Sequence, residues 1–246
     1  MAIVLEKKLE RGQRINLEKG DGSKLTNFCV GCNWGMIEQT AYKIQEVVDS
    51  EGFLGFGRKT HTERIPYKEK KEVDLDLSCI MVDANGKICD HIYSPLYRKD
   101  FLSKYGMPAG KLDSIDRALH HTGDDTEGDA DGDDGLDNEI ITVDLNRVSS
   151  NVDQIFFFLN NCGQEDFSQI PYAAIRMFEG SPERPPKQVF ASYDVAAESQ
   201  YKGKLALIMG KLYRKNGEWK FAAIGDAYED ANLCLTIRRI LTSYAQ

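Results

Sequence analysis

The chain has 246 residues, of which 41% are hydrophobic and 28% charged, as in an ordinary globular protein that buries a sizeable core. Its formal charge is −8, from 31 basic and 39 acidic residues, and no concentrated basic face is evident, which argues against nucleic acid as a main partner. No apolar run approaches the length of a membrane span, and the apolar stretch in Met1–Glu10 is too short for a signal peptide. We therefore expect a cytoplasmic protein with no direct membrane span.

Most apolar runs are short, rich in Val, Ile, Phe and Tyr, and separated by turn residues, which favours β-strands. Two Asn-Gly pairs, Asn85-Gly86 and Asn216-Gly217, stand between consecutive runs and predict tight hairpins, because Asn and Gly tolerate a positive φ. Many strands joined by tight turns predict an all-β sandwich or barrel. The expected strands are Gln13–Leu17, Asn27–Asn33, Val73–Val82, Lys87–Tyr93, Ile140–Leu145, Gln154–Asn160, Ala173–Phe178, Gln188–Asp194, Lys204–Leu212 and Trp219–Ile224.

Some stretches depart from this strand pattern. Residues Ile37–Ser50 have helix-like spacing, and the charged, Gly-containing residues Glu51–Glu72 are typical of a loop. Within Lys99–Leu119, the acidic and serine residues from Asp113 onward predict a helix start. The apolar spacing in Tyr228–Tyr244 predicts a closing C-terminal helix.

Six cysteines in a chain of this length do not indicate a disulfide scaffold. Only Cys29 and Cys32 have the spacing of a metal-ligand pair, and a structural zinc site usually needs a second such pair. Their apolar surroundings are typical of a buried strand, so we interpret both as small buried hydrophobes.

One segment, His121–Glu139, concentrates the negative charge. Its residues 124–139 hold nine acids and no Lys or Arg, and removing those nine acids from the formal charge of −8 leaves +1. Acids alternate with small residues, a pattern that lets a short chain curl around an ion. Calcium takes six to eight oxygen ligands, so the segment predicts a calcium-binding loop, which is called the acidic loop below.

The acidic loop nearly meets the EF-hand pattern, but Asn138 falls where the final Glu is needed and a strand follows in place of a helix. A second feature supports metal binding: Asp74 and Asp76 alternate with apolar residues in a strand, so both point to one face. The adjacent His120 and His121 must diverge in any regular structure, and we expect one to cap the loop and the other to lie at the surface.

Four segments together resemble the TerD family of tellurite-resistance and stress-response proteins. Asp74-Leu75-Asp76 matches the family's strand motif, and His121–Asp134 matches its acidic loop without a gap. Gly210–Phe221 is similar to its hairpin near the C-terminus, and Val30–Trp34 resembles its early strand. The resemblance runs over most of the chain.

The resemblance implies a calcium-binding β-sandwich of two antiparallel or mixed sheets, with a few short helices and a C-terminal helix, in one domain spanning residues 1–246. It implies insertions at about residues 35–72 and 98–119, and Asp137 or Glu139 in place of a family Glu that is Gly135 here. It also implies a cytoplasmic, non-enzymatic protein that acts with other tellurite-resistance proteins at the inner face of the membrane. Two calcium ions are implied, with ligands among Asp74, Asp76, Asp124, Asp125, Glu127, Gly128, Asp129, Asp131, Asp133, Asp134 and Glu139.

Two other functions stay open at this point. Carboxylates beside a divalent ion assist phosphoryl hydrolysis in some enzymes, so a metal-dependent hydrolase is one alternative. The other is a scaffold whose acidic loop docks a basic partner without metal, because acidic runs are usually solvated surfaces.

Overall fold

The computed structural model describes residues 13–19, 22–50, 59–163, 165–195 and 199–245. The predictions for Met1–Glu10 and for the first part of the Glu51–Glu72 loop, residues 51–58, lie outside these ranges. All ten strands expected from the apolar runs are present, with ends shifted by a few residues at most. The named strands of the described chain all pair antiparallel, and only a few short helices accompany them, so the fold is all-β, as predicted.

The larger sheet has six strands in the order β1-β13-β12-β9-β5-β6. Its central strands β5 and β9 are buried along their whole length. This explains their continuous apolar runs, because a strand covered on both faces has no need to alternate apolar with polar residues. The bounds are β1 Arg14–Asn16, β5 Leu75–Val82, β6 Ile88–Ile92, β9 Gln154–Asn161, β12 Ala206–Lys215 and β13 Glu218–Tyr228.

The smaller sheet has five strands in the order β11-β10-β2-β8-β7. The burial of β10 and β11 alternates along much of each strand, as expected for a sheet with one face on the core. The bounds are β2 Asn27–Trp34, β7 Leu119–His121, β8 Glu139–Asp144, β10 Ala173–Glu179 and β11 Gln188–Asp194. The three-residue strand β7, which leads into the acidic loop, is the one strand of this sheet that the sequence pattern missed.

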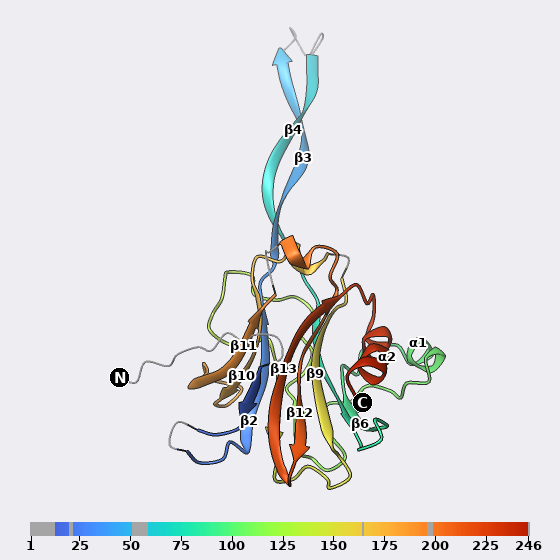
Figure 1. Ribbon diagram of the computed structural model, residues 1–246. Coiled ribbons are helices and arrows are strands. Elements are labelled where there is room, and N and C mark those ends of the chain that lie inside the picture. Colours follow the sequence, from blue (N-terminus) through green and yellow to red (C-terminus); the bar gives the residue numbers. More distant parts are fainter. Residues whose placement is uncertain (1–12, 20–21, 51–58, 164, 196–198, 246) are drawn as a thin grey trace.

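The main core lies between the two sheets, and a second core lies on the outer face of the six-stranded sheet (Figure 1). Helix α2, Leu233–Ser243, covers that outer face through Leu233, Ile237 and Ile240. The closing helix was predicted over Tyr228–Tyr244, but it begins later, where the Asn232 side chain accepts the backbone N–H of Leu235 at 3.2 Å. No helix among the described residues is long and apolar enough to cross a membrane.

The prediction of a helix at Ile37–Ser50 is wrong. These residues form strand β3, which pairs with β4, Lys59–Lys71, from Ile37↔Lys71 to Ser50↔Lys59. The prediction of a loop up to Glu72 is therefore also wrong for residues 59–71. The two strands make a long ribbon, the arm, which projects away from the sandwich (Figure 1). Apolar residues at both i+2 and i+3 spacing fit either structure, and the cross-strand partner decided between them.

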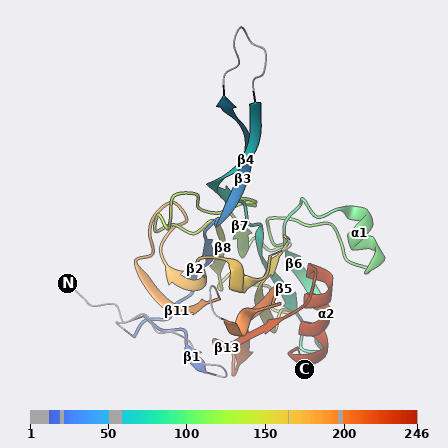
Figure 2. The ribbon, with the colours of Figure 1, turned by 90° about the horizontal axis from the view of Figure 1, so that it is seen from above.

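The segment at residues 98–119 is arranged differently from the prediction. Its helix, α1, is Lys99–Lys104, whereas the expected helix start at Asp113 is a turn in which Ser114 Oγ accepts the backbone N–H groups of Ala118 and Leu119. Figure 2 shows α1 and the arm leaving the body in different directions. Both Asn-Gly hairpins are present, although at the first of them only Gly86 has a positive φ, 74°.

Candidate metal centre

Acidic side chains converge at the end of the sandwich from which the arm leaves. Asp76 is the second residue of β5, which begins directly after Asp74, and it pairs with Asn160 near the end of β9. Glu139 is the first residue of β8, and Asp124 follows β7 in the acidic loop. The antiparallel register therefore brings residues from four separate segments to one place.

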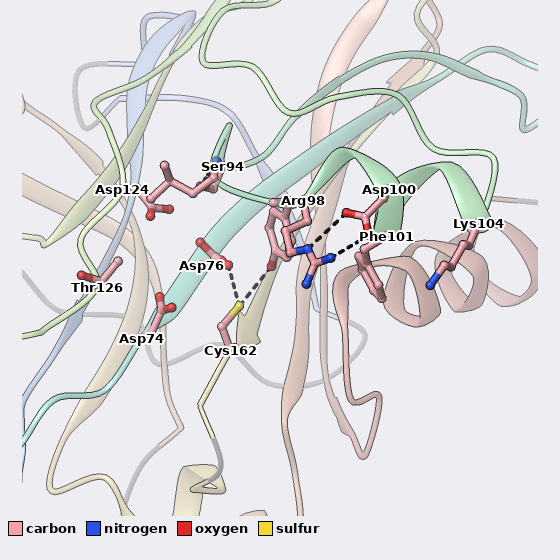
Figure 3. Close-up of a pocket in the computed structure, with 12 residues that line it drawn as sticks. Asp74, Asp76, Ser94, Arg98, Asp100, Phe101, Lys104, Asp124, Thr126 and Cys162 are labelled. Carbon is pink, nitrogen blue, oxygen red and sulfur yellow. Dashed lines mark hydrogen bonds and ion pairs between the residues drawn. The ribbon is translucent and has the colours of Figure 1, made fainter.

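The first cluster contains Asp76, Asp124 and Glu139, each of which offers a carboxylate oxygen within 4.8 Å of the others. Asp76 also joins Asp74 and Cys162 in an overlapping group with the same spacing. Asp74 and Asp76 point to one face, as the strand alternation predicted (Figure 3). Asp74 Oδ1 and Asp124 Oδ1 are buried without a hydrogen-bond partner among the described residues. A buried oxygen without a donor is costly, so these two atoms mark a place for a cation.

The pKa values of the aspartates in this cluster reflect the same cost of burying carboxylates close together. Burial, followed by the charges of Asp124 and Glu139, raises the pKa of Asp74 to about 6. Burial and the contact with Asp124 raise the pKa of Asp76 to about 8, although the hydrogen bond from Cys162 acts in the opposite direction. Carboxylates in such positions are stabilised as anions when a positive charge lies among them.

Glu139 is fixed from three sides. Its Oε2 accepts the backbone N–H of Leu77 at 2.7 Å, and its Oε1 accepts that of Asp125 at 3.0 Å. His121 Nε2 lies 3.4 Å from Oε2, and both side chains are buried. Burial raises the pKa of Glu139, while the hydrogen bond from His121 opposes that rise. The carboxylate thus holds the acidic loop against both sheets.

His121 has the capping role expected for one of the two histidines. Its Nδ1 accepts the backbone N–H of Gly123 at 3.1 Å, which leaves the proton on Nε2 facing the carbonyl oxygen of Leu77 at 3.1 Å. His120 is exposed, and its Nδ1 lies 2.9 Å from Asp113 Oδ1. The two side chains therefore diverge, as predicted.

A cavity of about 400 Å³ opens beside the first cluster, between the acidic loop and α1 (Figure 3). Cys162 Sγ donates to Asp76 Oδ2 at 2.6 Å and lies 3.1 Å from the Tyr97 hydroxyl. Burial of the thiol and the charge of Asp76 raise the pKa of Cys162. A thiol held protonated is a poor nucleophile, so this cysteine does not resemble the low-pKa thiolates of catalytic sites.

The second cluster lies in the acidic loop itself. Asp129, Asp133 and Asp134 offer oxygens within 4.8 Å of one another. Asp129 is fixed by the Tyr172 hydroxyl, which donates to Oδ2 at 2.9 Å, and by Asn138, which donates to Oδ1 at 3.0 Å. Burial, with smaller effects of Asp134 and Asp133, raises the pKa of Asp129. This cluster is more open to solvent than the first.

Four other residues predicted as ligands lie outside both clusters. Asp125 Oδ1 accepts the backbone N–H groups of Glu127 and Gly128, so its side chain builds the turn. Gly128 has a φ of +79° and packs its backbone against the Trp34 ring. The Glu127 side chain is exposed, and Asp131, whose side chain is 96% exposed, pairs with Lys70 on the arm.

Sequence reasoning missed several residues of the centre. Cys162 lies 86 residues from Asp76 along the chain, and Tyr97 belongs to the segment before α1, so no local spacing linked either to the acids. Tyr172, in the loop before β10, reaches the second cluster in the same way. Asp137, weighed from the family pattern as a replacement ligand, instead forms a 2.8 Å ion pair with Arg176.

The two cysteines with metal-like spacing do not form a site. Both are buried and free, as predicted, but Cys32 belongs to the main core while Cys29 packs with Phe178 and Val189 on the outer face of the five-stranded sheet. They are three residues apart in one strand, so their side chains point to opposite faces.

Comparison with known proteins gives consistent matches over nearly the whole chain. The model of the TerD domain family matches residues 5–237. The chain is 30% identical to stress response protein SCP2 of Bacillus subtilis (strain 168), over 95% of this chain and 96% of that protein. It is 27% identical to tellurium resistance protein TerZ of Serratia marcescens, over 89% of each chain.

A solved structure has the same fold at low sequence identity. The crystal structure of a homologue of telluride resistance protein (TerD) from Streptomyces coelicolor A3(2) superposes with a TM-score of 0.54. The superposition covers 90% of this chain and 98% of that one, at 11% identity.

Proposed function

The chain belongs to the TerD family, and from that premise we propose that it is a calcium-binding stress-response protein of the tellurite-resistance type. In this proposal the metal-loaded end of the sandwich is a calcium-dependent interaction module and has no catalytic role. The protein would act in the cytoplasm, with other tellurite-resistance proteins at the inner face of the membrane. The names of the relatives support the stress-response part, and the acidic clusters support the calcium part.

The observation that carries the calcium proposal is the pair of buried carboxylate oxygens without a donor, Asp74 Oδ1 and Asp124 Oδ1. They face the same small volume as Asp76, whose pKa burial raises to about 8. Two ionised carboxylates 4 Å apart repel by about 4 kcal/mol at an effective dielectric near 20, so without a cation this cluster retains protons. A divalent cation converts that repulsion into attraction and supplies the missing partner.

The donor set favours calcium. The first ion would be held by oxygens of Asp74, Asp76, Asp124 and Glu139, and the second by Asp129, Asp133 and Asp134. Calcium accepts many carboxylate oxygens in irregular geometry, whereas magnesium keeps several waters and demands an octahedron. Zinc and copper prefer nitrogen and sulfur, whereas these seven side chains all offer oxygen. The sulfur beside them, Cys162 Sγ, is held as a protonated thiol that donates to Asp76. When bound, the ion ties β5, β8 and the acidic loop together.

Isothermal titration calorimetry of the full chain with calcium, with magnesium as the matched control, tests this proposal. We expect calcium to bind far more tightly than magnesium, and Asp76→Asn to weaken calcium binding by at least tenfold. Equal binding of the two ions, or no loss of affinity in Asp76→Asn, would contradict the calcium assignment.

The two alternative functions make different predictions. A hydrolase would turn over generic phosphate or ester substrates, and Asp76→Asn would abolish that turnover. A metal-free scaffold would unfold at the same temperature with chelator and with calcium. We expect no turnover, and a higher unfolding temperature with calcium.

A further inference from the structure

The arm is a two-stranded ribbon that contacts the rest of the described chain at its base, through Ile37, Lys70 and Lys71. Strands β3 and β4 form a sheet of their own, and the arm projects clear of the sandwich (Figure 1). Several large apolar side chains on it are exposed, among them Tyr42 at 53%, Ile44 at 75% and Tyr67 at 44%. An isolated two-stranded ribbon is at best marginally stable in water, and long exposed apolar strand edges tend to pair with another strand.

The two edges of the arm differ. Strand β4 contains Pro66, which has no N–H to donate, and Lys68, Lys70 and Lys71, which discourage pairing along its edge. Strand β3 has 14 residues without a proline or a glycine. Its pairing with β4 is regular from Ile37 to Val48, before a bulge at Asp49. This regular stretch presents an unbroken row of backbone donors and acceptors, so only β3 is suited to accept a further strand.

We propose that the free edge of β3 pairs with β3 of a second copy of this chain, antiparallel about a two-fold axis through Ile44. In that register Ile44 lies opposite its own counterpart, Ala41 lies opposite Val47, and Thr40 lies opposite Val48. Within residues 40–48, where β3 is regular, each charged side chain lies opposite an uncharged one: Lys43 opposite Gln45, and Glu46 opposite Tyr42. Apolar cross-strand pairs stabilise a sheet and opposed like charges destabilise it, so β3 is complementary to itself.

Pairing through β3 leads to a dimer and no larger assembly. The resulting ribbon has the order β4-β3-β3-β4, so its two outer edges are the strands that carry Pro66 and the lysines. A two-fold contact of this kind uses the same surface on both copies and closes on itself. A partner bound to β4 would instead leave a β3 edge open and allow further addition.

The base of the arm is held by the acidic loop, which links the pairing to the proposed calcium site. At one end, Met36 N–H donates to the Asp129 carbonyl oxygen at 3.0 Å. At the other end, Val73 N–H donates to the Glu127 carbonyl oxygen at 3.0 Å, and Lys70 Nζ lies 2.6 Å from Asp131 Oδ1. This link rests on the proposed function: calcium that orders the loop fixes both ends of the arm and so favours the pairing.

Sedimentation equilibrium of the full chain tests the proposal with two matched variants. Ile44→Lys places two like charges at the two-fold axis, whereas Ile115→Lys changes an equally exposed isoleucine outside the arm, 79% against 75%. We expect a dimer in calcium that Ile44→Lys weakens by at least tenfold and Ile115→Lys does not. A calcium-loaded chain that stays monomeric, or equal effects of the two variants, would overturn the proposal.

The register has its own test. Position 44 faces itself across the axis, at a Cα separation of about 4.5–5.5 Å, which suits a disulfide. We expect Ile44→Cys to cross-link two copies through that position on mild oxidation, identified by peptide mapping, and Ile115→Cys not to do so. An oxidised dimer linked only through native cysteines would contradict the register.

The calcium link can fail separately from the pairing. The same sedimentation experiment in chelator should show a weaker dimer than in calcium. Equal affinities, in samples that calorimetry shows to bind calcium, would overturn the link. If calorimetry shows no calcium binding, the proposed function fails, while the comparison of Ile44→Lys with Ile115→Lys still decides the pairing.

Discussion

The carboxylate of Glu139, on the five-stranded sheet, accepts the backbone N–H of Leu77, on the six-stranded sheet, at 2.7 Å. The other oxygen of the same side chain holds the acidic loop through the backbone N–H of Asp125. One buried side chain therefore joins both sheets and the loop. Because both oxygens accept backbone N–H groups, the fold itself depends on this residue as well as the proposed metal site.

The first prediction concerns this bond. Glu139→Gln keeps one acceptor oxygen but turns an amide nitrogen toward a backbone N–H, so two donors face each other. We expect a loss of about 1.5–3 kcal/mol in the free energy of unfolding, the usual range for a hydrogen bond to a charged group. Urea unfolding in chelator measures it without interference from metal. Glu218→Gln, which alters an exposed ion pair with Lys24, is the control and should leave the midpoint close to that of the native chain. Equal midpoints for all three proteins would contradict the role of Glu139.

The second prediction separates two acids of the same loop. Asp124 lies in the first cluster, whereas the Glu127 side chain is exposed and lies outside both clusters. Asp124→Asn should therefore weaken calcium binding by at least tenfold in calorimetry, while Glu127→Gln should leave it within a factor of two or so. If the two variants bind calcium alike, bulk charge of the loop rather than this geometry attracts the ion.

The third prediction concerns pH. The pKa values of Asp74, about 6, and Asp76, about 8, lie above the ordinary carboxyl value of 3.8, so the metal-free fold binds protons that the unfolded chain releases. Its stability should therefore fall as pH rises from about 4 to about 8. Calcium requires ionised ligands, so its affinity should rise over the same interval and its binding should release protons.

Calorimetry at pH 6 and pH 8, in buffers of different ionisation enthalpy, measures both effects. We expect the calcium affinity at pH 8 to be higher by an order of magnitude or more. The reason is that each pH unit below the pKa of a ligand carboxyl lowers its ionised fraction by about tenfold. Glu127→Gln should keep this dependence. Equal affinity at both pH values, with no proton release, would contradict the prediction.

The fourth prediction compares two glycines of the acidic loop. Gly128 and Gly132 both have a positive φ, 79° and 95°, but a Cβ at Gly128 would meet the buried Trp34 ring while one at Gly132 would meet nothing within 4 Å. Gly132→Ala should cost about 1–2 kcal/mol from backbone strain alone. Gly128→Ala should cost about 1–3 kcal/mol more, from overpacking against Trp34. Thermal unfolding measures the stability of the two variants. A larger loss in Gly132→Ala than in Gly128→Ala would contradict this backbone conformation of the loop.

The sequence by itself determined the strands of the sandwich. Runs such as Ile155–Leu159 and the Asn216-Gly217 turn carry their structure locally, because β-branched and aromatic residues favour strands and Asn-Gly favours the hairpin turn. The acidic loop was also visible in the sequence, since no core position tolerates so many carboxylates. The arm was not, because Ile37–Ser50 becomes a strand only through pairing with residues 59–71.

Only the tertiary structure decided which acids face one another. Composition marks every acid of residues 124–139 alike, yet Asp124 turns inward while Asp131 turns out to Lys70. The difference arises from turns built by Asp125 and Gly128 and from the register that sets Asp76 opposite Asn160. Cys162 reaches the cluster for the same reason, because the antiparallel pairing of β5 with β9 brings it beside Asp76. Residues this far apart in the chain have no local sequence pattern that would show their contact.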